Sequence, residues 1–429
     1  MQVLLWHTLD IAQRESALAR PSGLAHVDVR AILKNVRENG DEALFEYTRK
    51  FDGVALESLK VPNADLKSAW DELPEADKTA LQTAKANIEA FHTAQMPKTI
   101  TQETMPGVVC RREPRPLDSA GLYVPGGTAP LVSTLMMLAI PAKIAGIAKC
   151  VVTTPPQKDG TINAALRACA YLCGIEDIYR VGGAQAIAAL AYGTQSIPKT
   201  VKIFGPGNAY VAAAKAQVSM EMGGPAIDLP AGPSEAMVLA DEDANPVFVA
   251  ADMLAQAEHD ALAQVICVCR SENFAAQLQT EIALQLDTLP RKDITAQALK
   301  HGRIFVVENT EDMLEIVNTY APEHLIVQVE NAESLMPEIR NAGSVFLGPW
   351  TPESVGDYAS GTNHTLPTFG AARAYSGLVL ESFMKFISVQ TLSRTGLETL
   401  GPTVERLAQM EGLEAHRRAV SLRLSGGNT

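Results

Sequence analysis

The sequence has no excess of basic residues. It contains 36 Lys and Arg against 49 Asp and Glu, which gives a net charge of −13 at neutral pH. Nucleic-acid phosphates and anionic membrane surfaces are bound by clustered Lys and Arg. We therefore expect no nucleic-acid partner and no membrane partner, and the acidic balance favours a protein that handles small molecules.

Long apolar runs are also missing, and we expect no targeting segment. No stretch approaches the roughly 20 apolar residues that span a bilayer. Residues 1–15 hold a short apolar run followed by polar residues, without the basic start and small-residue cleavage site of a signal peptide. We expect a cytoplasmic protein.

Cysteine is scarce, with six residues scattered over a chain of 429. A chain that is 47% hydrophobic can bury a large core and has little need of disulfides. Cys169 and Cys173 share a predicted helix face, but no second pair with ligand spacing accompanies them. We interpret the cysteines as small buried hydrophobic residues.

The chain also lacks a complete phosphate-binding fingerprint. Gly-rich turns follow predicted strands at residues 125–127, 182–185 and 205–208, and such turns can place a phosphate at a helix N-terminus. However, Tyr210 stands where the third glycine of the dinucleotide motif should be, and no GxxxxGK[ST] loop occurs. The turns are compatible with nucleotide binding or with simple tight turns between strand and helix.

Strand–helix alternation begins near residue 119. Alternation of short β-branched runs with helical stretches is typical of a parallel sheet covered by helices, so we predict an α/β fold. The runs lie at residues 121–124, 150–153, 178–181 and 201–204 and, after a Gly/Pro-rich break, at 236–240, 263–269, 303–307, 325–329 and 344–347.

The length predicts two or three domains. We expect two Rossmann-like parallel-sheet domains with incomplete phosphate motifs, a helical N-terminal segment and a helical C-terminal tail. The boundaries are 1–24 for the N-terminal segment, 25–120 with 236–378 for the first α/β domain, 121–235 for the second, and 379–429 for the tail. A cleft between two such domains is a common binding site.

Gln256 and His259 form the most informative motif. Asn245 can cap a helix and Pro246 suits its first position, so both side chains would lie three apart on one helix face. A neutral imidazole suits Zn²⁺, and an amide oxygen is an unusual but possible companion. The alternative is a pair of hydrogen-bonding surface groups.

Two further segments concentrate titratable groups. Glu323 and His324 stand at the edge of a predicted strand, where they could supply general bases near neutral pH. Residues 353–364 pack acids, a histidine and hydroxyls into one run, in which Asp357 is a plausible hard metal ligand and His364 could bind an anionic group. The alternatives are surface side chains and a solvated loop.

The loop at residues 228–235 contains two prolines and a glycine, which fix its backbone. It could present Ser234 to a ligand or serve as a stiff connector between domains. Glu411 and His416 lie near the end of the chain at helical spacing, where such residues are normally exposed.

Taken together and in this order, these segments resemble the histidinol dehydrogenase family, from the first helical region to about Arg423. The strings that carry the resemblance are GLYVPGG at 121–127, VGGAQA at 181–186, IFGPGN at 203–208, LPAGPSE at 229–235, QAEH at 256–259, PEH at 322–324 and GDYASGTNH at 356–364.

The resemblance implies an NAD⁺- and zinc-dependent oxidation of L-histidinol to L-histidine through the aldehyde, the last step of histidine biosynthesis. Two NAD⁺ would be consumed, and each subunit would hold one Zn²⁺. The implied zinc ligands are Gln256, His259, Asp357 and His416. The last ligand would come from the other subunit of a homodimer, which would explain the polar helical tail.

The family's catalytic bases fall on His324, for the alcohol proton, and Glu323, for activation of water in aldehyde hydration. The implied substrate contacts are Ser234, Gln256, His259, His324, Asp357, His364, Glu411 and His416, with Glu411 also donated across the dimer interface. The implied NAD⁺ contacts are Tyr123, Gln185 and Asn208.

Three other functions compete with this one. A relative could oxidise another small alcohol, although Glu411 and His416 favour an imidazole substrate. A zinc hydrolase could use Glu323 as its base without a nucleotide, but the Gly-rich turns argue weakly against it. A ligand-binding protein could hold a purely structural zinc, which would normally have a closed Cys and His ligand set.

Overall fold

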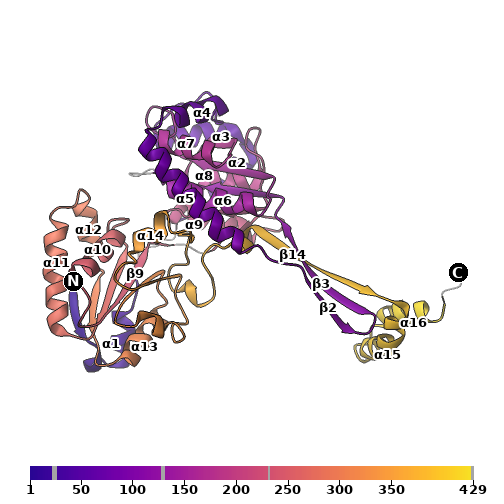
Figure 1. Ribbon diagram of the computed structural model, residues 1–429. Helices are drawn as coiled ribbons and strands as arrows, with labels where there is room; N and C mark the ends of the chain where they lie inside the picture. Colours follow the sequence, from indigo (N-terminus) through magenta and orange to yellow (C-terminus); the bar gives the residue numbers. More distant parts are fainter. Residues whose placement is uncertain (22–26, 127–130, 230–231, 427–429) are drawn as a thin grey trace. The chain divides into compact units, whose positions relative to one another are not determined.

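The computed structural model describes residues 1–21, 27–126, 131–229 and 232–426 (Figure 1). Two compact units divide the chain: residues 1–95 with 117–383, and residues 96–116 with 384–429. The first unit carries two parallel sheets covered by helices, so the predicted α/β fold is confirmed. In the described ranges, no helix is long and apolar enough to cross a membrane.

One parallel sheet has six strands in the order β1-β11-β10-β9-β12-β13. Its strands β9, β10 and β12 are buried along their whole length, as expected for a sheet covered on both faces. All six cysteines are free, and Cys267 and Cys269 are buried in β10. The strands are β1 (Gln2–Leu5), β9 (Glu235–Ala240), β10 (Gln264–Cys269), β11 (Arg303–Val306), β12 (His324–Gln328) and β13 (Ser344–Leu347).

The helices that cover this sheet follow the predicted alternation. Residues of α10 (Pro246–Ala257), α11 (Glu272–Leu286) and α12 (Lys292–Ala298) build the core on one face. Residues of α13 (Thr310–Tyr320) build the core on the other face, with Trp6. The short helix α14 (Glu353–Tyr358) follows β13.

The other parallel sheet has five strands in the order β6-β5-β4-β7-β8. The strands are β4 (Ser119–Tyr123), β5 (Lys149–Thr154), β6 (Asp177–Arg180), β7 (Lys202–Phe204) and β8 (Ala226–Ile227). The helices that alternate with them are α6 (Val132–Ile144), α7 (Ala164–Leu172), α8 (Gly183–Tyr192) and α9 (Ala209–Met220).

The helices before β4 belong with this five-stranded sheet. They are α2 (Arg30–Asn39), α3 (Asp41–Tyr47), α4 (Asn63–Glu72) and α5 (Glu75–Ala94). Helix α2 packs on α8, α4 on α7 and α5 on α6, and Leu33, Val36 and Leu44 join one core with the sheet. This differs from the expected grouping of residues 25–120 with 236–378, because helical periodicity shows which face is apolar but not which partner covers it.

Two terminal segments also differ from expectation. Residues 2–5 form β1 at the edge of the six-stranded sheet, ahead of the helix α1 (Ile11–Ala17), so the segment 1–24 is not purely helical. The tail contains a strand, β14 (Met384–Leu392), as well as α15 (Arg394–Met410) and α16 (Glu414–Leu424). The other predicted domain boundaries stay predictions.

The second unit is built on an antiparallel sheet. Strand β14 pairs with β3 (Val108–Pro116), which pairs with β2 (Ile100–Met105). Helices α15 and α16 pack on each other and lie at one end of these strands (Figure 1). The side chains of β14 are mostly exposed or half-buried, so its sequence lacks the strong apolar alternation that reveals a strand.

Candidate active site

A cavity of about 390 Å³ lies within the first unit. Residues from the segments that begin β9 and β12 line it, together with the turn that follows β7. The cavity therefore lies between the amino edge of the six-stranded sheet and the carboxyl edge of the five-stranded sheet. Parallel sheets usually bind their ligands at the carboxyl edge. The predicted site residues that line it are Asn208, Ser234, Gln256, His259, Glu323, His324, Asp357 and His364.

Helix α10 brings Gln256 and His259 to the cavity. The Asn245 side chain accepts a hydrogen bond from the main-chain N–H of Val247, and Pro246 occupies the first turn, as predicted. The helix ends at Ala257, and the N–H of His259 donates to the Gln256 carbonyl at 3.3 Å. Gln256 is buried, whereas His259 keeps much of its surface accessible. Both side chains thus meet the cavity where the helix ends.

Glu323 and His324 are buried at the start of β12. The Glu323 Oε2 accepts from the main-chain N–H of Glu235 at 2.8 Å, and the Gln256 Nε2 lies 3.4 Å away. His324 Nδ1 lies 3.2 Å from the Glu235 carbonyl and 3.3 Å from the Gln256 Nε2. Nδ1 thus faces an acceptor, the Glu235 carbonyl, and a donor, the Gln256 amide. In the tautomer that donates from Nδ1 to the carbonyl, Nε2 carries no hydrogen and can act as a base.

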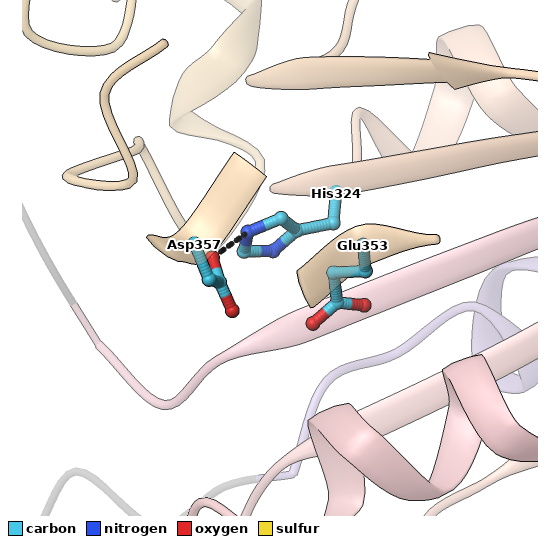
Figure 2. A group of neighbouring side chains, drawn as sticks. All are labelled: His324, Glu353 and Asp357. Atoms are coloured by element: carbon cyan, nitrogen blue, oxygen red, sulfur yellow. Dashed lines mark ion pairs between the residues drawn. The ribbon is translucent and has the colours of Figure 1, made fainter. Parts of the chain in front are cut away.

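Asp357 lies on the other side of the His324 ring. Its Oδ1 is 3.5 Å from His324 Nε2 (Figure 2), which makes no hydrogen bond to any residue that the structure describes. Glu353, one helical turn earlier on α14, presents a buried carboxylate whose two oxygens make no hydrogen bond within the described part of the chain. His324, Glu353 and Asp357 offer ligand atoms within 4.8 Å of one another. Glu353 lies in the predicted acidic run 353–364 but was assigned no role there, although its spacing of four from Asp357 places both on one helix face.

The charges of this cluster shift the proton affinities of its members. Burial opposes a charge on His324, but the carboxylates of Glu323, Glu353 and Asp357 outweigh it and raise the pKa of His324 well above its usual value. Burial raises the pKa of Glu323, partly offset by His324. Burial also opposes ionisation of Asp357, but the neighbouring His324 outweighs it and lowers the pKa of Asp357 overall. The site therefore combines a strong nitrogen base with a carboxyl group of raised pKa.

His364 is held in the cavity wall by both ring nitrogens. Its Nδ1 lies 2.9 Å from the main-chain oxygen of Asp357, and its Nε2 lies 3.2 Å from Thr134 Oγ1. The neighbouring Asn363 donates to the carbonyl of Met137 on α6 at 2.6 Å. The segment after α14 that carries Asn363 and His364 is thus fastened to α6, the helix that follows β4.

The predicted cofactor contacts lie at the carboxyl edge of the five-stranded sheet. Tyr123 ends β4, and its hydroxyl accepts from the N–H of Gly183, next to the buried Gln185. Asn208 caps α9 through bonds from the N–H groups of Tyr210 and Val211. Asn208 lines the cavity, whereas Tyr123 and Gln185 are not among its lining residues. Gly127 and the residues 230–231, in two of the quoted strings, lie outside the described ranges.

Glu411 and His416 belong to the second unit. Glu411 caps the end of α15, His416 lies in α16, and both are exposed. Neither is among the residues that line the cavity. Their predicted role in the site therefore requires a second copy of the chain.

The donor set around the cavity fits a zinc ion. Desolvation lowers the pKa of His259, so its ring is a neutral imidazole near neutral pH. Asp357 is a carboxylate, because its pKa is lowered. Gln256 turns its Nε2 toward Glu323 and His324, which leaves its oxygen for a cation. Nitrogen and oxygen donors of this kind suit Zn²⁺.

Comparison with known proteins identifies the family. A family model described as histidinol dehydrogenase matches residues 19–424. Histidinol dehydrogenases from Mannheimia succiniciproducens and Campylobacter jejuni are 52% and 50% identical to this chain, over 99% of each pair of sequences. A crystal structure of histidinol dehydrogenase from Elizabethkingia anophelis superposes with a TM-score of 0.96 at 44% identity, covering 100% of this chain and 99% of that one. This chain, with its Glu–His pair, its imidazole and its carboxylates around one cavity, belongs to the histidinol dehydrogenase family.

Proposed function

We propose that this protein oxidises L-histidinol to L-histidine through histidinal, with two NAD⁺ as hydride acceptors and one Zn²⁺ per subunit, as the last step of histidine biosynthesis in the cytoplasm. The observation that carries the proposal is the single cavity that joins Glu323 and His324 to Gln256, His259 and Asp357. It combines two groups able to move protons with donors able to hold a cation.

In the first oxidation, His324 takes the hydroxyl proton of histidinol while a hydride leaves the carbon that bears this hydroxyl. The Nε2 of its buried ring faces Asp357 without a hydrogen bond to any described residue, which supports this role. The three nearby carboxylates stabilise the imidazolium that results. General-base catalysis of this kind contributes roughly 10²–10⁴-fold to a rate.

In the second oxidation, Glu323 removes a proton from the water that adds to the aldehyde. Hydration is needed because the aldehyde carbon must carry an oxygen from water before a second hydride can leave. Burial raises the pKa of Glu323 toward the working pH, which suits a group that takes and returns a proton. The Glu235 N–H holds Oε2 in place at 2.8 Å.

Gln256, His259 and Asp357 would hold zinc, with His416 of the partner subunit as the fourth ligand. When bound, zinc would supply a cation that orients the amine and imidazole of the substrate. Ser234 and His364 line the same cavity and would contact histidinol. Tyr123, Gln185 and Asn208 would contact NAD⁺, which supplies the hydride acceptor.

We further propose a homodimer in which His416 and Glu411 of the partner subunit complete the site. Exposed apolar side chains near both residues support a buried partner surface: Leu407 is 54% exposed, Met410 70% and Leu413 42%. Exposed apolar patches mark interaction surfaces in soluble proteins.

Removing one zinc donor is expected to remove the metal and the activity together. In His259→Asn, metal analysis should find the zinc content falling from ~1 ion per chain toward zero, with loss of NADH formation from histidinol. His7→Asn is the matched control, because His7 is an exposed histidine outside the cavity. A His259→Asn protein that keeps full zinc and full activity would rule out this ligand set.

Gly205→Ala is expected to weaken NAD⁺ use selectively. Gly205 has a φ of +115°, and an added Cβ would lie 2.0 Å from the Tyr123 carbonyl oxygen. The turn from Gly205 to Asn208 must therefore shift away from Tyr123, so the KM for NAD⁺ should rise more than the KM for histidinol. In the control Gly146→Ala, the φ is +86° but nothing lies within 4 Å. Equal effects of the two substitutions on both KM values would contradict the cofactor assignment.

A further inference from the structure

Arg20 lies far from the catalytic pair in sequence, yet its guanidinium is fixed on Glu235, whose main chain contacts both members of that pair. Its Nε donates to Glu235 Oε1 at 2.5 Å, and its Nη2 donates to Glu235 Oε2 at 2.9 Å. The Glu235 side chain is 2% exposed and that of Arg20 is 15% exposed. The N–H of Phe369 also donates to Glu235 Oε1, at 2.9 Å. A bidentate pair of this kind fixes both position and orientation.

The main chain of Glu235 holds both catalytic side chains. Its N–H donates to Glu323 Oε2 at 2.8 Å, and its carbonyl lies 3.2 Å from His324 Nδ1. A rotation of this one residue would therefore move the partners of Glu323 and His324 together. The side-chain pair between Glu235 and Arg20 opposes that rotation.

Arg20 also holds the chain that leads into Glu323. Its Nη2 donates to the Tyr320 carbonyl at 2.8 Å, and its guanidinium stacks 3.9 Å from the centre of the Tyr320 ring. The next residue, Ala321, has a φ of +55°, which is uncommon for a residue with a side chain. Such a conformation persists only where surrounding contacts impose it. Arg20 supplies contacts immediately before this turn.

We propose that Arg20, through Glu235 and Tyr320, is a positioning residue for the reaction and sets the separation of Glu323 and His324. This inference rests on the roles proposed above for those two side chains. Arg20 touches neither base: it braces the strand start at Glu235 and the turn at Tyr320–Ala321. One segment begins β9 and the other leads from the end of α13 into Glu323 and His324, so one guanidinium links the segment that carries both bases to the strand start whose main chain contacts them.

The test is Arg20→Met in the full-length protein, with histidinol oxidation and the oxidation of added histidinal measured separately. Both kcat values should fall by about 100-fold, the effect expected of a small misplacement of catalytic groups. Each KM should change less than the corresponding kcat. Because Glu235 holds both bases, the two oxidations should fall by similar factors.

Arg14→Met is the matched control. Arg14 lies in the same N-terminal segment, stacks on Trp6 at 4.6 Å and pairs with Glu315 at 3.7 Å, so it makes the same kinds of contact. It is not among the residues that line the cavity. Its loss should lower thermal stability without changing either kcat by more than about twofold.

A second variant separates positioning from stability. Arg20→Met alone leaves the buried Glu235 carboxylate unpaired, which is destabilising. The double variant Arg20→Met with Glu235→Gln removes that charge and should recover much of the melting temperature while kcat stays low. Arg20→Lys keeps the positive charge but cannot form the bidentate pair with Glu235, so its kcat should lie between those of the wild type and Arg20→Met.

The outcomes distinguish the two proposals. If the wild-type protein forms NADH from histidinol and a folded Arg20→Met protein stays within twofold of its kcat, the positioning role is overturned alone. If kcat in the double variant recovers together with the melting temperature, Arg20 is structural and the positioning role is also overturned. If the wild-type protein forms no NADH from histidinol, the proposed function is overturned, and the inference fails with it.

Discussion

Glu323→Gln is expected to stop the reaction at the aldehyde. The amide cannot remove a proton from water, so hydration of histidinal loses its base, while His324 can still take the alcohol proton. The oxidation of added histidinal should fall by roughly 10²–10⁴-fold. The NADH formed per histidinol consumed should fall from two toward one, with histidinal released and measurable by an aldehyde trap.

Glu46→Gln is the control for this substitution, because Glu46 is an exposed residue of α3 and does not line the cavity. It should keep both oxidations at the wild-type rate. If Glu323→Gln slowed both oxidations equally and still gave two NADH per histidinol, the assignment of Glu323 to hydration would be wrong.

The oxidation of histidinol to the aldehyde is expected to rise with pH, because only a neutral His324 can take the alcohol proton. Burial would lower the pKa of His324, but Glu323, Glu353 and Asp357 outweigh it and raise that pKa. The charged form is therefore lost only as pH passes the raised pKa. The rise should lie on the alkaline side of the ordinary imidazole value of about 6.5.

Two other histidines face the same cavity but should not produce this rise. Burial lowers the pKa of His259 and of His364, so both are already neutral in the alkaline range. His324→Asn should abolish the pH-dependent rise and lower the rate by about 10²–10⁴-fold. His301→Asn, which lies outside the cavity, should keep the wild-type profile. A rate in the wild-type protein that falls or stays constant over this pH range would contradict the role of His324.

Family membership narrows the alternatives that the sequence left open. A relative at 52% identity over 99% of both chains carries the name histidinol dehydrogenase. That likeness favours an oxidation over a zinc hydrolysis or passive ligand binding. The substitutions and the pH dependence described above test whether the cavity oxidises histidinol in the two proposed steps.

Much of the site could be predicted from local pattern. Gln256 and His259 lie three apart at a helix end, and the cap at Asn245 that begins this helix is formed as predicted. The pair Glu323–His324 begins a strand, as expected from the apolar run that follows it. Such features depend on neighbours within a few residues, so one sequence carries them.

The other features of the fold and of the site depend on contacts between segments that are distant in the sequence. Arg20 and Glu235 are 215 residues apart, and nothing in the local pattern of either indicates the other. The partner of the helices at residues 30–94 is set by tertiary packing rather than by periodicity. Strand β14 is paired on one side only and is largely exposed, so propensity alone did not reveal it. A role for Glu353 could not be predicted from local pattern, because it depends on the position of α14, which places this carboxylate near His324.

A metal-dependent oxidation in two steps at one site is tested most directly by the amount of NADH formed per L-histidinol consumed. The measurement is made with Zn²⁺ present and repeated after treatment with a chelator. We expect two NADH per histidinol with zinc and none after chelation. One NADH per histidinol, or two that survive complete removal of the metal, would contradict it.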